Sequence, residues 1–265
     1  MSRPRFTDLL ASEWIKVRSL RSVSWAIGLS ALLVVVMNLG AAMTDYLNWF
    51  DYGEEIRAGF FPDWSIDAAF SQGAMMVSFL AVSAIGAVLV ASEYGTGMIR
   101  TTFAAVPARR GVMAAKLLVT AALFAAWGAV VAVVSFFGSQ WILSWRDVGV
   151  PITHPGALRL VAASALLAPL AAVVGMGLAA LLRHVAASIV TAVALLLLAP
   201  ALINSQRDWL IHVDNAFPMT AWTRLADLAP DVPPPYLTTG TAWAVYGVWA
   251  ALAVALATVV VRRDP

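Results

Sequence analysis

Residues 93–116 read EYGTGMIRTTFAAVPARRGVMAAK and form a short charged segment between two long apolar runs. The preceding run, residues 68–92, and the following run, residues 117–145, contain no Asp, Glu, Lys or Arg. Both runs exceed the roughly 20 apolar residues that a helix needs to cross a bilayer. Residues 93–116 are therefore predicted to link two membrane-spanning helices on one side of the membrane.

A short helix is expected inside this link. Gly95 and Gly97 allow a sharp turn at its start, and Pro107 ends the pattern. Between them, apolar or small side chains recur at helical spacing: Met98, Ile99, Thr102, Phe103 and Val106. This helix is expected to lie along the inner membrane surface, with an apolar stripe suited to docking against another molecule.

The composition indicates an integral membrane protein. The chain has 265 residues, of which 61% are hydrophobic and only 12% are charged. Soluble domains carry about 25% charged residues, and here the apolar residues are gathered into long blocks. We predict one all-α transmembrane domain over residues 1–265 with six spanning helices, which are residues 22–44, 68–92, 117–145, 160–182, 185–206 and 237–261.

The distribution of basic residues predicts the orientation. With the N-terminus inside, twelve Lys and Arg residues fall on the inner side: five before residue 22, four in 100–116, Arg183, and the pair Arg262 and Arg263. The outer side holds the other five. Because inner segments of membrane proteins carry an excess of Lys and Arg, both termini are predicted to be cytoplasmic.

The N-terminal segment, residues 1–22, is expected to contain a cytoplasmic amphipathic helix over residues 4–21. One face of this helix would carry Phe6, Leu9, Leu10, Trp14, Val17 and Leu20. Such a helix lies in the membrane interface, where its aromatic and basic side chains reach the headgroups. The alternative is that these residues form only a basic flank that orients the first span.

No catalytic or metal-binding constellation is evident. The chain has no cysteine, and its three histidines, His154, His184 and His212, do not show ligand spacing. No Walker A loop is present, so the chain itself is not expected to hydrolyse ATP. We therefore expect no catalytic residue, no metal and no cofactor bound by this chain.

The spans also lack Asp, Glu, Lys, Arg and His, and the strongly polar side chains away from their ends are the amides of Asn38, Gln72 and Gln140. Transporters that are driven by protons or ions keep ionisable groups inside their spans. If this protein transports, its free energy must therefore come from a partner. The sparse polar lining favours a hydrophobic or amphiphilic cargo.

Two motifs carry a resemblance to a known family. Glu-Tyr-x-x-Gly-x-Ile-Arg-Thr-Thr at 93–102, followed by Pro107 and the arginines Arg109 and Arg110, resembles the cytoplasmic loop of ABC-2-type transporter permeases, especially the short actinobacterial kind. Residues 12–22, SEWIKVRSLRS, resemble the helix that precedes the first span in this family.

The resemblance implies the transmembrane subunit of an ATP-driven exporter in a bacterial plasma membrane. Two cytoplasmic ABC ATPase subunits would bind ATP and Mg, and a second permease copy, identical or homologous, would complete the complex in the lipid bilayer. No nucleic acid is expected as a partner. The alternative is a non-transporting scaffold or sensor subunit that docks an ATPase.

The resemblance also implies roles for particular residues. The ATPase would dock on the coupling segment 93–116, at Glu93, Tyr94, Gly97, Ile99, Arg100, Thr102, Phe103, Arg109 and Arg110. The interfacial helix would contribute Glu13, Trp14, Lys16, Arg18 and Arg21. In the outer loop 204–240, short helices would dip back into the membrane and close the pathway at Phe217, Pro218 and Trp222.

Glu93 is the acid with the most suggestive position, because it ends a span at the negative end of a helix dipole. It is expected either to have a cationic neighbour or to cap the short helix that follows. The candidate cations are Arg100, Lys16 and Lys116, and an ion pair with Arg100 would require the glycines to fold the chain back.

Overall fold

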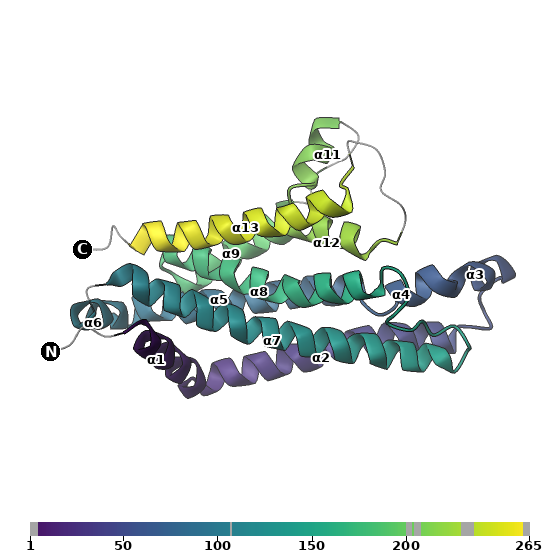
Figure 1. The fold of residues 1–265 in the computed structure, drawn as a ribbon, viewed down its shortest axis with the longest axis horizontal. Helices are drawn as coiled ribbons and strands as arrows, with labels where there is room; N and C mark the ends of the chain where they lie inside the picture. The colour runs from purple at the N-terminus through teal and green to yellow at the C-terminus, as the bar shows by residue number, and fades with distance from the viewer. Residues whose placement is uncertain (1–4, 107, 200–202, 204–207, 229–235, 262–265) are drawn as a thin grey trace.

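The protein folds as an elongated bundle in which the long helices run side by side (Figure 1). The computed structural model describes residues 5–106, 108–199, 203, 208–228 and 236–261. Within these ranges the regular secondary structure is helical, and turns and loops connect the helices.

Five helices are long and apolar enough to cross a membrane, which confirms the multi-pass helical architecture. They are α2 (Arg21–Leu47), α5 (Gln72–Gly95), α7 (Arg109–Ser144), α8 (Ala157–Leu182) and α13 (Thr239–Val260). Helices α2, α5, α7 and α8 each extend beyond the predicted span at one or both ends. Helix α7, for example, begins at Arg109 and includes the basic residues that precede its apolar run.

The fifth predicted span is only partly described. Helix α9 (Val185–Val193) continues into the π-helical segment η2 (Ala194–Leu198). Together they form a shorter apolar helix, Val185–Leu198, whose 14 residues rise about 21 Å against the roughly 30 Å hydrocarbon core. Residues 200–202 and 204–206 of the predicted span 185–206 lie outside the described residues.

The turn before α9 is as tight as the sequence predicts. Arg183 ends α8 with a left-handed backbone (φ 56°), and His184 precedes α9. The Nδ1 atom of His184 accepts a hydrogen bond from the backbone N–H of Ala187 at 3.2 Å. This local bond caps α9 and fixes the reversal between the two helices.

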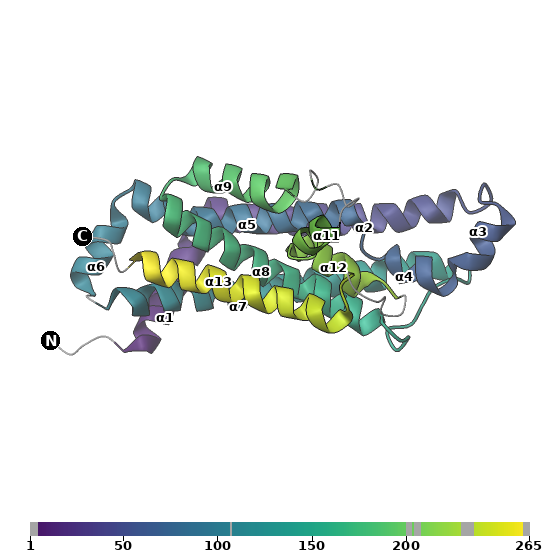
Figure 2. The same cartoon turned by 90° about the horizontal axis from the view of Figure 1, so that it is seen from above.

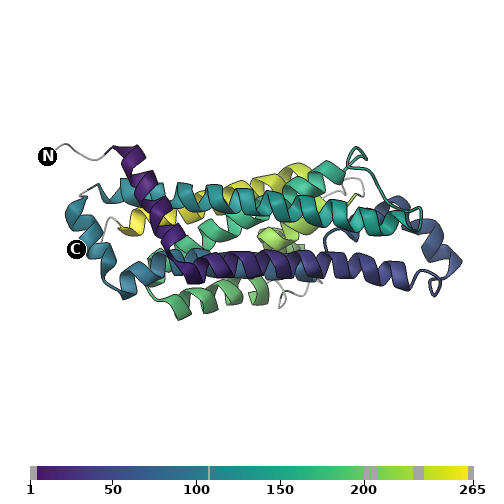
Figure 3. The ribbon, with the colours of Figure 1, turned by 90° about the horizontal axis from the view of Figure 1, so that it is seen from below.

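Shorter helices lie at both ends of the bundle. They are α1 (Phe6–Ser19), α3 (Glu54–Gly59), the π-helical η1 (Phe60–Trp64), α4 (Ser65–Asp67), α6 (Met98–Ala105), α11 (Asp208–Asp214) and α12 (Pro218–Ala226). Figures 1 and 2 show α1, α6 and the last turns of α13 at one end, which we call the α6 end, and α3 at the opposite α3 end. Seen from below, α1 runs across the direction of the long helices (Figure 3).

Helix α8 forms the centre of the bundle and packs against α5, α7 and α13. Its contact with α5 is close enough that backbone touches backbone. A Cβ atom at Gly86 of α5 would overlap the carbonyl of Ala172, and one at Gly175 of α8 would overlap the carbonyl of Ser83. Small residues at such positions let membrane helices approach closely and pack through van der Waals contacts.

Helices α2 and α13 are peripheral. In their most apolar 18-residue windows only 22% and 17% of residues are buried, against 67% for the windows of α5 and α8. Large apolar side chains such as Trp25, Leu29 and Leu252 are exposed on them. These surfaces fit contact with lipid or with another protein chain.

Candidate functional site

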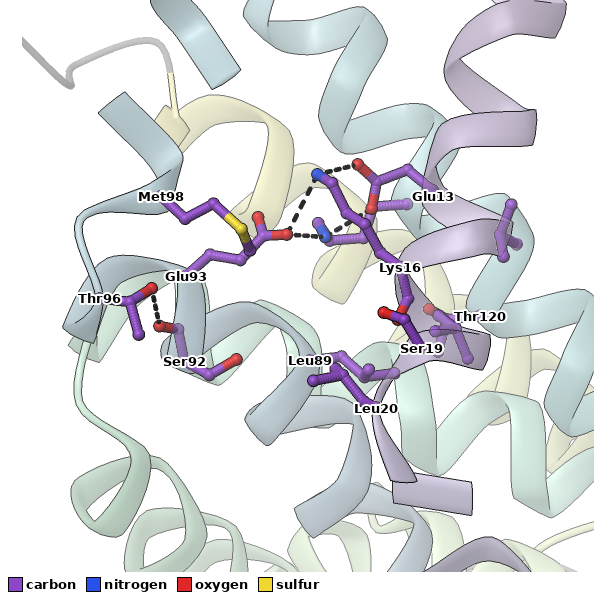
Figure 4. Close-up of a pocket in the computed structure, with 13 residues that line it drawn as sticks. Glu13, Lys16, Ser19, Leu20, Leu89, Ser92, Glu93, Thr96, Met98 and Thr120 are labelled. Atoms are coloured by element: carbon purple, nitrogen blue, oxygen red, sulfur yellow. Dashed lines mark hydrogen bonds and ion pairs between the residues drawn. The ribbon is translucent and has the colours of Figure 1, made fainter. Parts of the chain in front are cut away.

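Four charged side chains meet at the α6 end, and we call them the charge quartet: Glu13 and Lys16 of α1, Glu93 of α5 and Lys116 of α7 (Figure 4). The Nζ atom of Lys116 lies 2.6 Å from Glu13 Oε2 and 2.8 Å from Glu93 Oε1. The Nζ atom of Lys16 lies 2.6 Å from Glu13 Oε1 and 3.2 Å from Glu93 Oε1. Each lysine therefore bridges the two glutamates.

Three members of the quartet are buried, and burial determines how much free energy the ion pairs contribute. Glu13, Glu93 and Lys116 are 2%, 3% and 5% exposed. Removing one partner from a buried ion pair costs about 3–5 kcal/mol, because the remaining charge is left uncompensated. The quartet therefore fastens α1 to α5 and α7 through groups that depend on one another.

The local sequence explains this arrangement. Glu13 and Lys16 are three residues apart on α1, so they share a face, and Val17 is buried beside them. Glu93 lies in the last turn of α5. Lys116 lies seven residues into α7, at about 10 Å from its first residue, so the helix carries this ammonium group into the bundle.

The surroundings of Lys16 change its pKa. Burial by itself lowers the pKa of Lys16, but its hydrogen bond to Glu13 and the negative charges of Glu93 and Glu13 outweigh burial and raise the pKa above its ordinary value of 10.5. Lys16 is therefore cationic at neutral pH, as its two ion pairs require.

The structure selects between the expected partners of Glu93. Lys16 and Lys116 are its cationic neighbours. Arg100 is exposed on α6, and among the described residues no ion pair joins it to Glu93. The capping alternative is also not found, because Glu93 Oε1 accepts only from the two lysines and Glu93 Oε2 accepts no hydrogen bond among the described residues.

Helix α6 lies in the predicted link between the second and third spans. Its Ile99 and Phe103 are 6% and 8% exposed and belong to the hydrophobic core of the bundle. The guanidinium group of Arg109 lies 5.4 Å from the centroid of the Phe103 ring. Ile99 and Phe103 of the predicted apolar stripe therefore pack against the protein itself, whereas Met98 of the same stripe is exposed. Pro107, the predicted stop, lies outside the described residues.

The opposite face of α6 is open. Its exposed residues are Arg100, Thr101, Ala104 and Ala105. Of the other residues assigned to docking, Arg110 is exposed, whereas Tyr94, Gly97, Thr102 and Arg109 are half-buried. The guanidinium group of Arg183 lies 5.5 Å from the Tyr94 ring centroid. Docking of a partner on these residues stays a prediction.

The residues assigned to the interfacial helix divide into two groups. Glu13 and Lys16 face the bundle through the charge quartet. Trp14, Arg18 and Arg21 are exposed, and the Arg18 guanidinium group lies 5.9 Å from the Trp14 ring centroid. An aromatic ring and arginines on the outward face are typical of a helix at the headgroup level.

The predicted outer-gate residues are buried at α12. Phe217 precedes the helix, and Pro218 occupies its first turn. The indole N–H of Trp222 donates to Ser164 Oγ of α8 at 3.0 Å, and α12 also packs against α13. The indole N–H of Trp249 donates to the carbonyl of Ala216 at 2.7 Å. Trp249 lies ten residues into α13, so the chain before α12 reaches about 15 Å along that helix.

Sequence reasoning missed two features of the site. It treated Glu13 only as an interfacial residue and did not pair it with Lys116, and it did not single out Thr120, which is fully buried next to Lys116 on α7. The one available signal was a lysine at the start of an apolar run, which needs a buried anion. No group of three or more His, Asp or Glu side chains in the described part of the chain is arranged to hold a metal ion.

The long apolar helices thus define the class, a multi-pass helical membrane protein. No model of a known protein family and no curated protein sequence matches this chain.

Proposed function

We propose that this chain is the permease subunit of an ATP-driven ABC exporter of the ABC-2 type. In this proposal it works as a dimer with a second permease and two cytoplasmic ABC ATPase subunits in a bacterial plasma membrane, with both termini in the cytoplasm. The cargo would be a hydrophobic or amphiphilic compound. The observation that carries the proposal is α6, a short helix outside the long helices whose inner face is anchored and whose outer face is open.

The contacts around α6 suit the transmission of a movement. Ile99 and Phe103 hold α6 to the bundle, and only Thr96 and Gly97 separate it from α5. Glu93, in the last turn of α5, is bound to Lys16 of α1 and Lys116 of α7. A push on the open face of α6 would therefore reach three helices at once.

The α12 region supports the proposed outer gate. Ala216, just before α12, is hydrogen-bonded to Trp249 about 15 Å along α13, and Trp222 of α12 is hydrogen-bonded to Ser164 of α8. Helix α12 therefore lies beside the spans rather than beyond their ends. We propose that α11 and α12 dip into the outer half of the membrane, where Phe217, Pro218 and Trp222 close the pathway.

The docking face can be tested with a matched pair of variants. Ala104→Glu places a carboxylate on the open face of α6, and Ala58→Glu does the same on exposed α3 at the opposite end. Burying an unpaired carboxylate in an interface costs several kcal/mol. Co-purification from native membranes, with partners identified by mass spectrometry, should recover an ABC ATPase with the unmodified chain and Ala58→Glu, but not with Ala104→Glu.

Recovery of no ABC ATPase with the unmodified chain would contradict the proposal. Equal recovery with Ala104→Glu would remove α6 from the docking surface. An ATPase complex that does not move a fluorescent phospholipid or a lipophilic dye across reconstituted vesicles in the presence of ATP would favour the scaffold or sensor alternative.

A further inference from the structure

A cavity of about 400 Å³ lies beside the charge quartet (Figure 4). Helices α1, α5 and α7 line it, together with Met98 at the start of α6. The apolar residues that line it are Val17, Leu20, Leu89, Met98 and Val119. Its polar lining includes the quartet and Thr120. The exposed residues Ser19 and Leu20 lie at its rim, where the cavity meets the surface.

Two polar atoms of the lining residues lack a hydrogen-bond partner among the described residues: Glu93 Oε2 and Thr120 Oγ1. Both are buried, since Glu93 is 3% and Thr120 is 0% exposed. A buried polar atom without a partner costs free energy, and most such atoms in proteins are paired with a protein group, a water or a ligand. Both atoms belong to residues that line the cavity, so each could be satisfied by a hydrogen-bonding group held there.

The charges around these atoms restrict what can bind there. The other oxygen of Glu93, Oε1, already accepts from Lys16 and Lys116. Two acids and two bases balance formally, so a charged head group would gain no net charge attraction from the quartet. Its burial would therefore cost desolvation free energy without compensation. A neutral hydrogen-bond donor avoids this cost.

We propose that this cavity binds an amphiphile whose uncharged head carries hydroxyl groups. One hydroxyl donates to Glu93 Oε2, another exchanges a hydrogen bond with Thr120 Oγ1, and the apolar tail lies along Leu20, Leu89 and Val119. The inference does not depend on an ATPase partner, because the site is complete within the single chain. The bound molecule would brace α1 against α5 and α7.

The absence of native cysteine provides a clean reporter. Ser19→Cys places a thiol at the cavity rim, and Ser12→Cys is its matched control. Both serines are exposed on α1, and each donates its hydroxyl at 2.8 Å to the carbonyl three residues earlier, but only Ser19 lines the cavity. Maleimide labelling is measured on the full chain in phosphatidylcholine nanodiscs with three probes that share a tail: 1-dodecylglycerol, dodecylammonium and dodecanoate.

We expect 1-dodecylglycerol to slow labelling of Ser19→Cys about tenfold at ten times its half-saturating concentration, because only about one site in eleven is then free. Labelling of Ser12→Cys should not change, and the two charged probes should protect much less. Equal protection by all three probes would show an apolar crevice without head-group recognition. No protection by 1-dodecylglycerol would show that water alone fills the cavity. Either result overturns the proposal.

A second pair of variants tests the polar lining without disturbing the quartet. Thr120→Val, in the Ser19→Cys background, keeps the shape of the side chain but removes the hydroxyl that has no partner. The half-saturating concentration of 1-dodecylglycerol should rise about threefold to tenfold, the value of one hydrogen bond. Thr120→Ser should retain the original value. An unchanged value in Thr120→Val would exclude Thr120 from the site and contradict the proposal.

Discussion

The two ends of the bundle are held together by different chemistry. At the α6 end, four charged groups join α1, α5 and α7. Towards the α3 end, side-chain amides join the helices through hydrogen bonds. Asn38 of α2 donates to Ser135 Oγ of α7 and accepts from the backbone N–H of Ser71, each at 3.0 Å.

Gln140 of α7 is the second amide bridge. It donates to the carbonyl of Ser65 and accepts from the backbone N–H of Val150 at 2.8 Å. An amide can donate and accept at once, so it joins two segments without burying a charge. The charge quartet loses most of its value when one of its buried members is removed, whereas an amide bridge loses only its own hydrogen bonds. The α6 end is therefore the more cooperative of the two.

The largest effect is expected from Lys116→Met. This change keeps the length of the side chain but leaves Glu13 and Glu93 with only the half-buried Lys16. The free energy of unfolding in lipid bicelles should fall by about 3–5 kcal/mol. Glu13→Gln combined with Lys116→Met should cost clearly less than the sum of the two single changes, since the partners act as a unit. Strict additivity would show that the quartet is not cooperative.

A smaller loss is expected from Gln140→Leu at the other end. The change leaves the carbonyl of Ser65 and the N–H of Val150 without their partner. The free energy of unfolding should fall by about 1–3 kcal/mol, measured in the same bicelles. A loss equal to that of Lys116→Met would contradict the difference between the two ends.

Ser164→Ala should cost about 0.5–1.5 kcal/mol, because it removes one hydrogen bond, from the indole N–H of Trp222, with little change in side-chain volume. Ser164→Ala in the Trp222→Phe background should then add little. A double-mutant cycle with no coupling between the two positions would show that this bond does not hold α12 to α8.

The smallest effect is expected from Lys16→Met, which changes the more exposed lysine of the quartet. Its side chain is 27% exposed against 6% for Lys116. Solvent screening limits its contribution to about 0–1 kcal/mol. Because the folded pKa of Lys16 is raised, this contribution is complete below pH 10.5 and is lost as the pH rises through the folded value. A stability curve in which unmodified protein and Lys16→Met differ most above that range would contradict this sign.

The features that were predicted correctly depend on local patterns. Apolar runs longer than a bilayer gave the long helices, and Gly97 followed by helical spacing gave α6. What remained open depends on packing. The stripe of Ile99 and Phe103 is visible in the sequence, but periodicity does not say whether the bundle or a partner covers it.

The choice of cation for Glu93 shows the same limit. Arg100 is near in sequence and Lys16 is 77 residues away, yet Lys16 is the partner, because α1 packs against α7 and brings Lys16 to the last turn of α5. Nor does the sequence show that two such distant lysines share one carboxylate oxygen. Pairings of this kind follow from the arrangement of helices, which spacing alone does not determine.

The contact between α5 and α8 has a mechanical consequence. Because Gly86 and Gly175 each receive a backbone carbonyl where a side chain would stand, neither helix can slide along the other without a collision with the next side chain. The two helices should therefore move as one rigid unit, with α6 attached at the C-terminal end of α5. If α6 is tilted, the N-terminal half of α8 should be displaced in the opposite direction. Ser164, which accepts the hydrogen bond from Trp222, lies in this half.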